Sequence, residues 1–277
     1  MNTTMISAPA APRTSFDRLT WAIVDSWTIA KRDLLHWRNQ PAGFLVGLFF
    51  PVLMVFMFGY LLGGGMTVPG GGDYRAYLMP GMFALTMAFG LESTFTLVST
   101  DAAKGVTDRF RSLPMSGSAV VIGRGIAEMV GSAAALAVLV ATGLLVGWRW
   151  DNGFPMALAA FGLLLLLRSS LLWVGIYMGL RWRPESVVAL QILIWPFAFL
   201  SNAFAAPETM PDWLRPLVEW NPLSATVTAT RELFGNPGAV SGSFTSDNAL
   251  ALAVAWPLLI SAIFLPLAVR SYRRLSR

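Results

Sequence analysis

The chain has 277 residues, of which 55% are hydrophobic and 13% charged, with a formal net charge of +5 and no cysteine. This composition, together with a mean hydropathy of +0.60, excludes an ordinary soluble domain and predicts a protein that crosses a membrane several times. The absence of cysteine excludes disulfides and thiol catalysis, and a single histidine, His36, excludes a zinc site built from His and Cys ligands.

The N-terminal part of the chain is expected to be a polar tail followed by an amphipathic helix from Phe16 to Arg38. Apolar residues recur there at helical spacing: Ile23, Trp27, Ala30, Leu34 and Trp37. The opposite face carries Arg18, Asp25, Arg32 and His36. Tryptophan on one face and charge on the other favour a helix that lies in the membrane interface, so residues 1–41 are predicted to form a cytoplasmic tail and an interfacial helix.

Six later segments are apolar and long enough to be transmembrane helices, since about 20 residues at helical rise cross the hydrocarbon layer. They run approximately from Ala42 to Leu62, Tyr77 to Ser99, Gly125 to Trp148, Pro155 to Leu180, Ser186 to Phe204 and Asn248 to Val269. The predicted fold class is therefore an all-α integral membrane protein whose six-helix transmembrane domain occupies residues 42–269.

The distribution of Lys and Arg among the connections predicts the orientation, because positive residues near helix ends stay cytoplasmic. Fifteen of the twenty basic residues fall in the N-terminal region, in residues 101–124, beside the turn at residues 181–183, or in the tail 270–277. Both termini are thus predicted to be cytoplasmic. The same asymmetry accounts for the isoelectric point near 10.1, and no nucleic-acid partner is expected.

The segment 101–124 concentrates charge between two apolar runs: Asp101, Lys104, Asp108, Arg109, Arg111 and Arg124. Such charge is expected to lie in water, on a short helix that ends at Ser112-Leu113-Pro114. Glu128 is a candidate member of the same cluster. The segment could dock on a partner protein or could be an ordinary positive loop without one.

Two charged residues lie well inside apolar segments, Glu92 in the second and Arg168 in the fourth. A charge at membrane depth is costly unless it is paired or faces a wet cavity, so both residues are candidates for a substrate path. Both segments run from the outside inward and place the two residues at similar depth, which suggests an ion pair within a subunit or across a dimer. The alternative is that Arg168 snorkels while Glu92 meets water near the inner boundary.

Residues 206–247 are predicted to form an external loop with two short helices. The second helix is expected to begin with Asn221 as the N-cap and Pro222 at its first position. Trp213 is among the apolar residues through which the loop would contact the outer membrane interface.

Several fragments, in this order and spacing, resemble those of one transporter family. They are YLMPG from Tyr77, DRFRSLPMSGSAVVIGR from Asp108, RWRPE from Arg181, the stretch from Pro196 to Phe204, MPDWL from Met210, then Asn221-Pro222 and Arg231. The chain resembles the permease subunits of ABC type-2 exporters, particularly the daunorubicin/doxorubicin-resistance type. The resemblance implies outward export of an amphipathic or hydrophobic substrate such as a drug, an antibiotic or a lipid-like molecule.

The resemblance also implies partners: a nucleotide-binding ATPase subunit, a second permease subunit and membrane lipid. The coupling interface would be formed by Arg32, Lys104, Asp108, Arg109, Arg111 and Arg124, and the external loop motif by Trp213, Asn221, Pro222 and Arg231. A phosphate-binding Walker A motif requires Lys followed by Ser or Thr, whereas Lys31 and Lys104 precede Arg32 and Gly105. The chain is therefore not expected to be the ATPase or any enzyme, and ATP and Mg²⁺ would be bound by the partner rather than by this chain.

Two other functions fit parts of the sequence less well. An ion-gradient-coupled secondary transporter would use Glu92 as its coupling site, but the inverted repeats typical of that class are not apparent. An intramembrane enzyme would need paired carboxylates or a histidine cluster at membrane depth, and the sequence suggests neither. Localisation in the bacterial plasma membrane is expected in either transporter case.

Overall fold

The computed structural model describes residues 24–31, 35, 41–65, 68, 71–105, 117–238 and 242–274. The ordered elements are α2 (Pro41–Phe56), η1 (Met57–Leu62), η2 (Gly63–Gly65), α3 (Tyr74–Ala103), α5 (Gly117–Leu145), α6 (Phe154–Gly179), η3 (Pro184–Ser186), α7 (Val187–Phe199), η4 (Pro207–Thr209), α8 (Arg215–Glu219), α9 (Pro222–Phe234), α10 (Phe244–Asp247) and α11 (Ala249–Arg274). No strand occurs within those ranges, in agreement with the all-α prediction.

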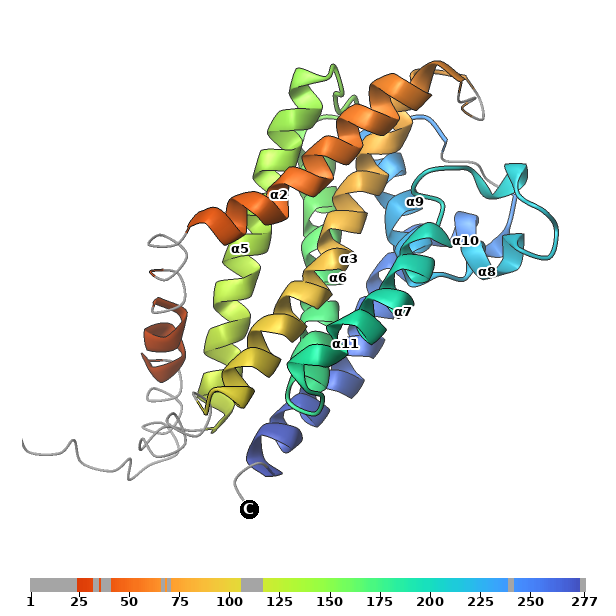
Figure 1. Cartoon of the computed structure of the whole chain (residues 1–277). Helices are drawn as coiled ribbons and strands as arrows, with labels where there is room; N and C mark the ends of the chain where they lie inside the picture. The colour runs from red at the N-terminus through yellow and green to blue at the C-terminus, as the bar shows by residue number, and fades with distance from the viewer. Residues whose placement is uncertain are drawn as a thin grey trace, which may run out of the picture.

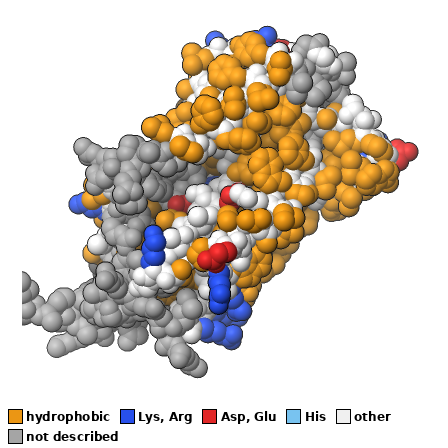
Figure 2. All heavy atoms as spheres, viewed as in Figure 1, with side chains coloured by type: hydrophobic (Ala, Val, Ile, Leu, Met, Phe, Trp, Pro, Cys, Tyr) orange, Lys and Arg blue, Asp and Glu red, His pale blue; other side chains and the backbone are white. Residues whose placement is uncertain are grey.

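Within the described part of the chain, four helices are long and apolar enough to cross a membrane: residues 74–103, 121–145, 154–179 and 249–272. Two shorter apolar helical stretches, residues 45–61 and 184–199, occupy the positions of the first and fifth predicted segments. In Figure 1 the long helices run side by side, and the C-terminal end of α3, the turn between α6 and α7, and the C-terminal end of α11 lie at the same end of the bundle. Figure 2 shows a broad hydrophobic surface on one face, with basic side chains gathered mainly toward that end.

The largest difference from a predicted boundary is at the third segment, where α5 begins at Gly117 rather than at Gly125. The fifth segment is shorter than predicted, because α7 ends at Phe199 rather than at Phe204. Pro196 lies inside its last turn, and the backbone N–H of Leu200 closes the helix by donating to the Pro196 carbonyl. Residues 200–205 then form turns. The apolar composition continues past the end of the helix because these turns are buried in the bundle. Hydropathy alone cannot distinguish a buried apolar turn from the continuation of a membrane-spanning helix.

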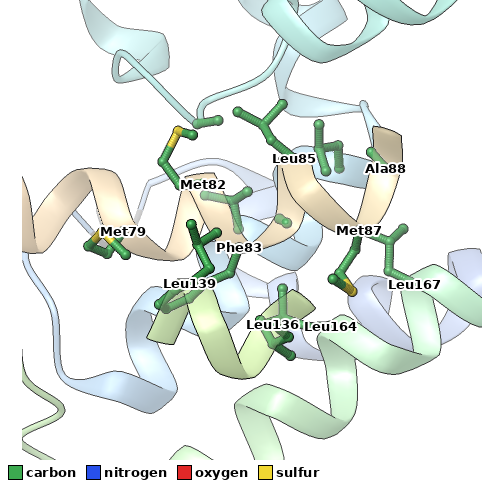
Figure 3. Packing of buried hydrophobic residues seen from close by; sticks show 14 of the residues in the cluster. Met79, Met82, Phe83, Leu85, Met87, Ala88, Leu136, Leu139, Leu164 and Leu167 are labelled. Carbon is green, nitrogen blue, oxygen red and sulfur yellow. The ribbon is translucent and has the colours of Figure 1, made fainter. Parts of the chain in front are cut away.

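The core forms where α3 packs between α5, α6, α7 and α9. Figure 3 shows Phe83 and Met87 of α3 on the side of the leucines of α5 and α6, whereas Met82 and Leu85 point to the opposite side of the helix. Phe83 also makes edge contacts with Trp148 and Phe234, with ring centroids 5.0 Å and 6.1 Å away. The long α3 helix is thus the central element of the bundle, and most of the candidate functional residues contact it.

Two glycines in long helices differ sharply in their surroundings. A Cβ on Gly81 of α3 would lie 2.5 Å from the carbonyl oxygen of Ala203, whereas a Cβ on Gly162 of α6 would meet nothing within 4 Å.

We expect Gly81→Ala to destabilise the chain by about 1–3 kcal/mol, because the buried backbone must move apart. Gly162→Ala should instead stabilise it by up to about 1 kcal/mol through helix propensity. Thermal unfolding of the two purified variants in detergent micelles measures the contrast, and equal melting temperatures would contradict the close approach at Gly81.

Candidate functional site

Arg168 of α6 is 1% exposed and lies at the centre of a polar cluster that joins three helices. Its Nε donates to Ser132 Oγ of α5 at 2.7 Å, and its Nη2 donates to Thr94 Oγ1 of α3 at 2.8 Å and to Glu128 Oε2 of α5 at 2.9 Å. We call these four residues the Arg168 cluster. Glu128 is 5% exposed, so the two opposite charges neutralise each other away from water.

Small residues make room for this guanidinium. A Cβ on Gly90 of α3 would lie 2.6 Å from Arg168 Nε, so only glycine allows α3 to pass so closely. The Thr94 hydroxyl accepts from Arg168 and lies 2.9 Å from Glu128 Oε2, which connects the three side chains directly. Among the described residues, Arg168 Nη1 has no hydrogen-bond partner.

Glu92, the other charged residue predicted for the substrate path, lies elsewhere. Its Oε1 accepts a hydrogen bond from Gln191 Nε2 at 2.7 Å, which links α3 to α7. The predicted Glu92–Arg168 pair within one chain is therefore wrong, as is the alternative that Arg168 snorkels. The partner was misassigned because Glu128, near the start of the third predicted segment, was counted with the cytoplasmic cluster. In the structure α5 begins eight residues earlier than predicted, and Glu128 is buried within the bundle.

The charged segment 101–124 is described only at its two ends. Lys104 is exposed, whereas Arg124 is 6% exposed and forms an ion pair with Asp101, joining the start of α5 to the end of α3. Arg124 is thus buried against Asp101 and does not lie in water as expected, whereas Asp101 remains partly exposed. Of the predicted coupling residues, Arg32, Asp108, Arg109 and Arg111 lie outside the described residues.

Residues 24–31 of the predicted interfacial segment are helical and contact the bundle beside this ion pair. Ile29 and Ala30 are buried, and Gly123 of α5 approaches so closely that an added Cβ would collide with the backbone of Ser26. Trp27 is 57% exposed. Ser26, Ile29 and Ala30 therefore form the face that meets the bundle. Of the predicted apolar stripe, Ala30 lies on this face and Trp27 does not.

At the other end of the bundle, Asn221 joins α7 to α9. Its Oδ1 accepts from the Leu223 backbone N–H at 2.9 Å, and Pro222 follows at the first helical position, which confirms the predicted N-cap. Its Nδ2 donates to the carbonyls of Phe197 and Leu200 at 2.8 Å and 2.6 Å. One amide therefore starts α9 and also pairs carbonyls at the C-terminus of α7, which lack partners within that helix.

Arg231 of α9 is 1% exposed, although its charge suggested a residue of an external loop. It donates to the carbonyls of Tyr77, Asn202 and Ala203 at 3.0, 2.8 and 3.2 Å, and its guanidinium lies 3.6 Å from the centroid of the Tyr77 ring. No carboxylate among the described residues forms an ion pair with it. Burial lowers the pKa of Arg231, but an arginine remains a cation in proteins, so these carbonyls and the ring stabilise its charge.

Trp213 of the external loop motif is 73% exposed and contributes to no such cluster.

An apolar groove of about 350 Å³, counted to its open mouth, lies among α2, α3 and α7. Trp195 lines this groove, and the centroid of its ring lies 4.9 Å from that of Phe89 and 5.7 Å from that of Phe50. Apart from Thr86, the residues that line the groove are apolar, so it suits a hydrophobic molecule. The described residues contain no group of three or more His, Cys, Asp or Glu that could hold a metal.

Sequence reasoning missed the partners of both buried arginines. Thr94, Ser132, Tyr77 and Asn202 are common residues of apolar helices and turns, and they carry no charge that would single them out. The only available signal was Glu128, an acidic residue inside a run that is apolar on both sides. It indicated a second buried charge that could neutralise Arg168.

Comparison with known proteins shows matches over most of the chain. The family model described as ABC-2 type transporter matches residues 25–234. The chain is 33% identical over 244 residues to the daunorubicin resistance ABC transporter permease protein DrrB1 of Streptomyces coeruleorubidus, covering 87% of this chain and 83% of that protein. It is also 24% identical over 236 residues to the putative transport permease ycf38 of Pyropia yezoensis, covering 82% and 77% of the two chains.

These matches cover most of the chain, including the Arg168 cluster, α7, α9 and Arg231. Together with the four long apolar helices, they make it a multi-pass protein of the bacterial plasma membrane. The chain belongs to the ABC-2 type transporter family.

Proposed function

We propose that the chain is the transmembrane permease subunit of an ABC exporter that moves an amphipathic or hydrophobic substrate outward. ATP would be hydrolysed by a separate subunit, which would also bind Mg²⁺, since this sequence has no lysine followed by Ser or Thr. The observation that carries the proposal is the match to a permease of a daunorubicin resistance transporter over most of both chains. A second permease subunit, identical or related, would complete the pathway.

The cytoplasmic end of the bundle supports a route for coupling. Residues 24–31 pack against Gly123, and the neighbouring Arg124–Asp101 pair ties both arms of the segment 101–124 together. Displacement of that segment by an ATPase would therefore move α3 and α5 as a unit, and the Arg168 cluster would carry α6 with them. ATP binding can bias this motion only by favouring one of the two conformations over the other.

The groove around Trp195 supports a hydrophobic or amphipathic cargo. Phe50, Phe89 and Phe199 surround the indole ring and offer edge and face contacts to an apolar molecule entering between α2 and α7. Membrane lipid would contact the same exposed apolar surface. The proposed cargo path therefore runs along this groove, with Glu92 and Gln191 as the nearest hydrogen-bonded polar pair between α3 and α7.

Recovery of an ATPase tests the proposal directly. The chain purified from native membranes in mild detergent is expected to bring down a subunit with a phosphate-binding loop, whose ATP hydrolysis changes when the permease is present. The variant Arg109→Glu/Arg111→Glu should insert normally but lose that subunit, because repulsion replaces attraction at the docking segment. Arg149→Glu, on the predicted outer side, is the matched control.

A homo-oligomer that recovers no ATPase would point to ion-gradient transport, and Glu92→Gln would then be tested for loss of ion-driven uptake or export.

A further inference from the structure

A polar pocket lies at the end of the bundle that carries Arg231, between the turn after α7, α9 and the segment before α10. It encloses about 400 Å³, counted to its open mouth. The polar residues that line it carry amide, hydroxyl or carboxyl groups: Asn202, Glu208, Glu219, Ser224, Thr228 and Thr245 are among them. Among the described residues, no Lys, Arg or aromatic side chain lines this pocket.

Asn202 forms a rigid and incompletely paired part of the wall. It is 5% exposed, and its backbone carbonyl accepts from Tyr77 Oη at 3.0 Å and from Arg231 at 2.8 Å. Its backbone N–H donates to Ser224 Oγ, and its side-chain Nδ2 donates to Thr228 Oγ1 at 2.7 Å. The amide Oδ1 has no partner among the described residues. A buried amide oxygen without a partner is costly.

The free amide atom persists whichever way the amide is oriented. If the oxygen and nitrogen of Asn202 are exchanged, Thr228 becomes the donor and the amide nitrogen is left unpaired instead. In the first orientation, the Thr228 hydroxyl accepts from Asn202 and donates to no described residue. The wall therefore offers the Thr228 hydroxyl as a donor, while the unpaired amide atom of Asn202 is itself buried from solvent.

The charges around the pocket nearly balance. Glu219 is paired with Arg215 at 2.8 Å, while Glu208 makes no ion pair with a described residue. The buried Arg231 cation lies directly behind Asn202, to whose carbonyl it donates. A ligand with a full charge therefore gains little here, whereas a neutral ligand whose groups both donate and accept can use the Thr228 hydroxyl and the Glu208 carboxylate together.

Neighbouring hydroxyl groups meet this requirement. We propose that the pocket between Asn202, Thr228 and Glu208 binds a neutral polyhydroxyl group, as found in a glycosyl or glycerol head group. Such a group could belong to the exported substrate, in which case the inference rests on the proposed function, or to a lipid of the outer leaflet. The carbonyl of Asn202 also accepts hydrogen bonds from Arg231 of α9 and Tyr77 of α3. A ligand in the pocket would therefore stabilise the buried contacts between α3 and α9.

Binding can be measured on the full chain in phosphatidylcholine nanodiscs, with methyl β-glucoside as the probe and saturation-transfer NMR as the readout. The wild-type chain is expected to bind the glucoside and not 2-methoxytetrahydropyran, which has the same ring without hydroxyls. Thr228→Val should weaken binding about threefold to tenfold, the effect of one lost hydrogen bond. Thr226→Val is the matched control, because Thr226 lies on the same helix, is fully buried and does not line the pocket.

Two further arms identify the source of the hydroxyls. Displacement of the probe when phosphatidylglycerol replaces part of the lipid assigns the pocket to a lipid head group, while displacement by an alkyl glucoside alone assigns it to an amphipathic substrate. Absence of glucoside binding, equal binding by Thr228→Val, or displacement by methylammonium that Glu208→Gln abolishes would overturn the proposal. No ATPase is present in this experiment, so its failure is distinct from failure of the proposed export function.

Discussion

Glu128→Leu is expected to destabilise the chain by about 3–5 kcal/mol, because it leaves the Arg168 guanidinium buried without its countercharge. The double variant Glu128→Leu/Arg168→Leu should recover most of this loss, since it removes both charges from an apolar environment. Thermal unfolding of the purified single and double variants in the same detergent gives the coupling between the two side chains.

Glu92→Leu is the matched control for this experiment. Glu92 is only partly buried and is bonded to the neutral Gln191, so its loss should have a much smaller effect and should not be compensated by Arg168→Leu. Additive effects of Glu128→Leu and Arg168→Leu would contradict a direct pair. If Arg168→Leu compensated for the loss of stability in Glu92→Leu, Arg168 would have to pair with Glu92, contrary to its contacts with Thr94, Glu128 and Ser132.

Arg231→Met should have an effect of similar size, about 3–5 kcal/mol, because the carbonyls of Tyr77, Asn202 and Ala203 would each lose a charged donor in a buried site. Arg231→Lys should recover part of the stability, since an ammonium retains the charge but cannot reach all three carbonyls with the geometry of a guanidinium. Unfolding temperature in detergent is again the measurement.

Arg215→Met provides the comparison at the same end of the bundle. Arg215 is 40% exposed and pairs with Glu219 one helical turn away, an arrangement worth less than about 1 kcal/mol. If Arg215→Met and Arg231→Met lowered the unfolding temperature equally, the role of Arg231 in holding the turn after α7 would be wrong.

The sequence predicts the helical fold and several boundaries because these depend on local composition. The fourth predicted segment agrees with α6 within one residue at each end, and Asn221-Pro222 starts α9 as expected. Caps and apolar runs can be recognised from neighbouring residues. The family resemblance likewise depends on fragments in order along the chain, and the comparisons confirm it.

The pairing of buried charges could not be predicted in the same way. Arg168 has partners 36, 40 and 74 positions away, on two other helices, so no spacing in the sequence identifies them. Glu92 was predicted as the partner because it lies at a depth in the membrane similar to that of Arg168. Rotation of each helix about its axis, however, decides which side chains meet. Similarly, the charge of Arg231 indicated an exposed loop because sequence reasoning did not foresee the carbonyls left free where α7 ends.

The position of Arg168 also has a consequence for the biogenesis of the protein. A single arginine at the centre of a helix opposes lateral release from the translocon by about 2.5–3.5 kcal/mol, and the five leucines that immediately precede it, residues 163–167, favour release by about 1.5–3 kcal/mol together. The leucines therefore offset most of the cost of placing the unpaired arginine in lipid. Its acceptors, on α3 and α5, are synthesised earlier in the chain, so the arginine can be captured as soon as α6 leaves the channel.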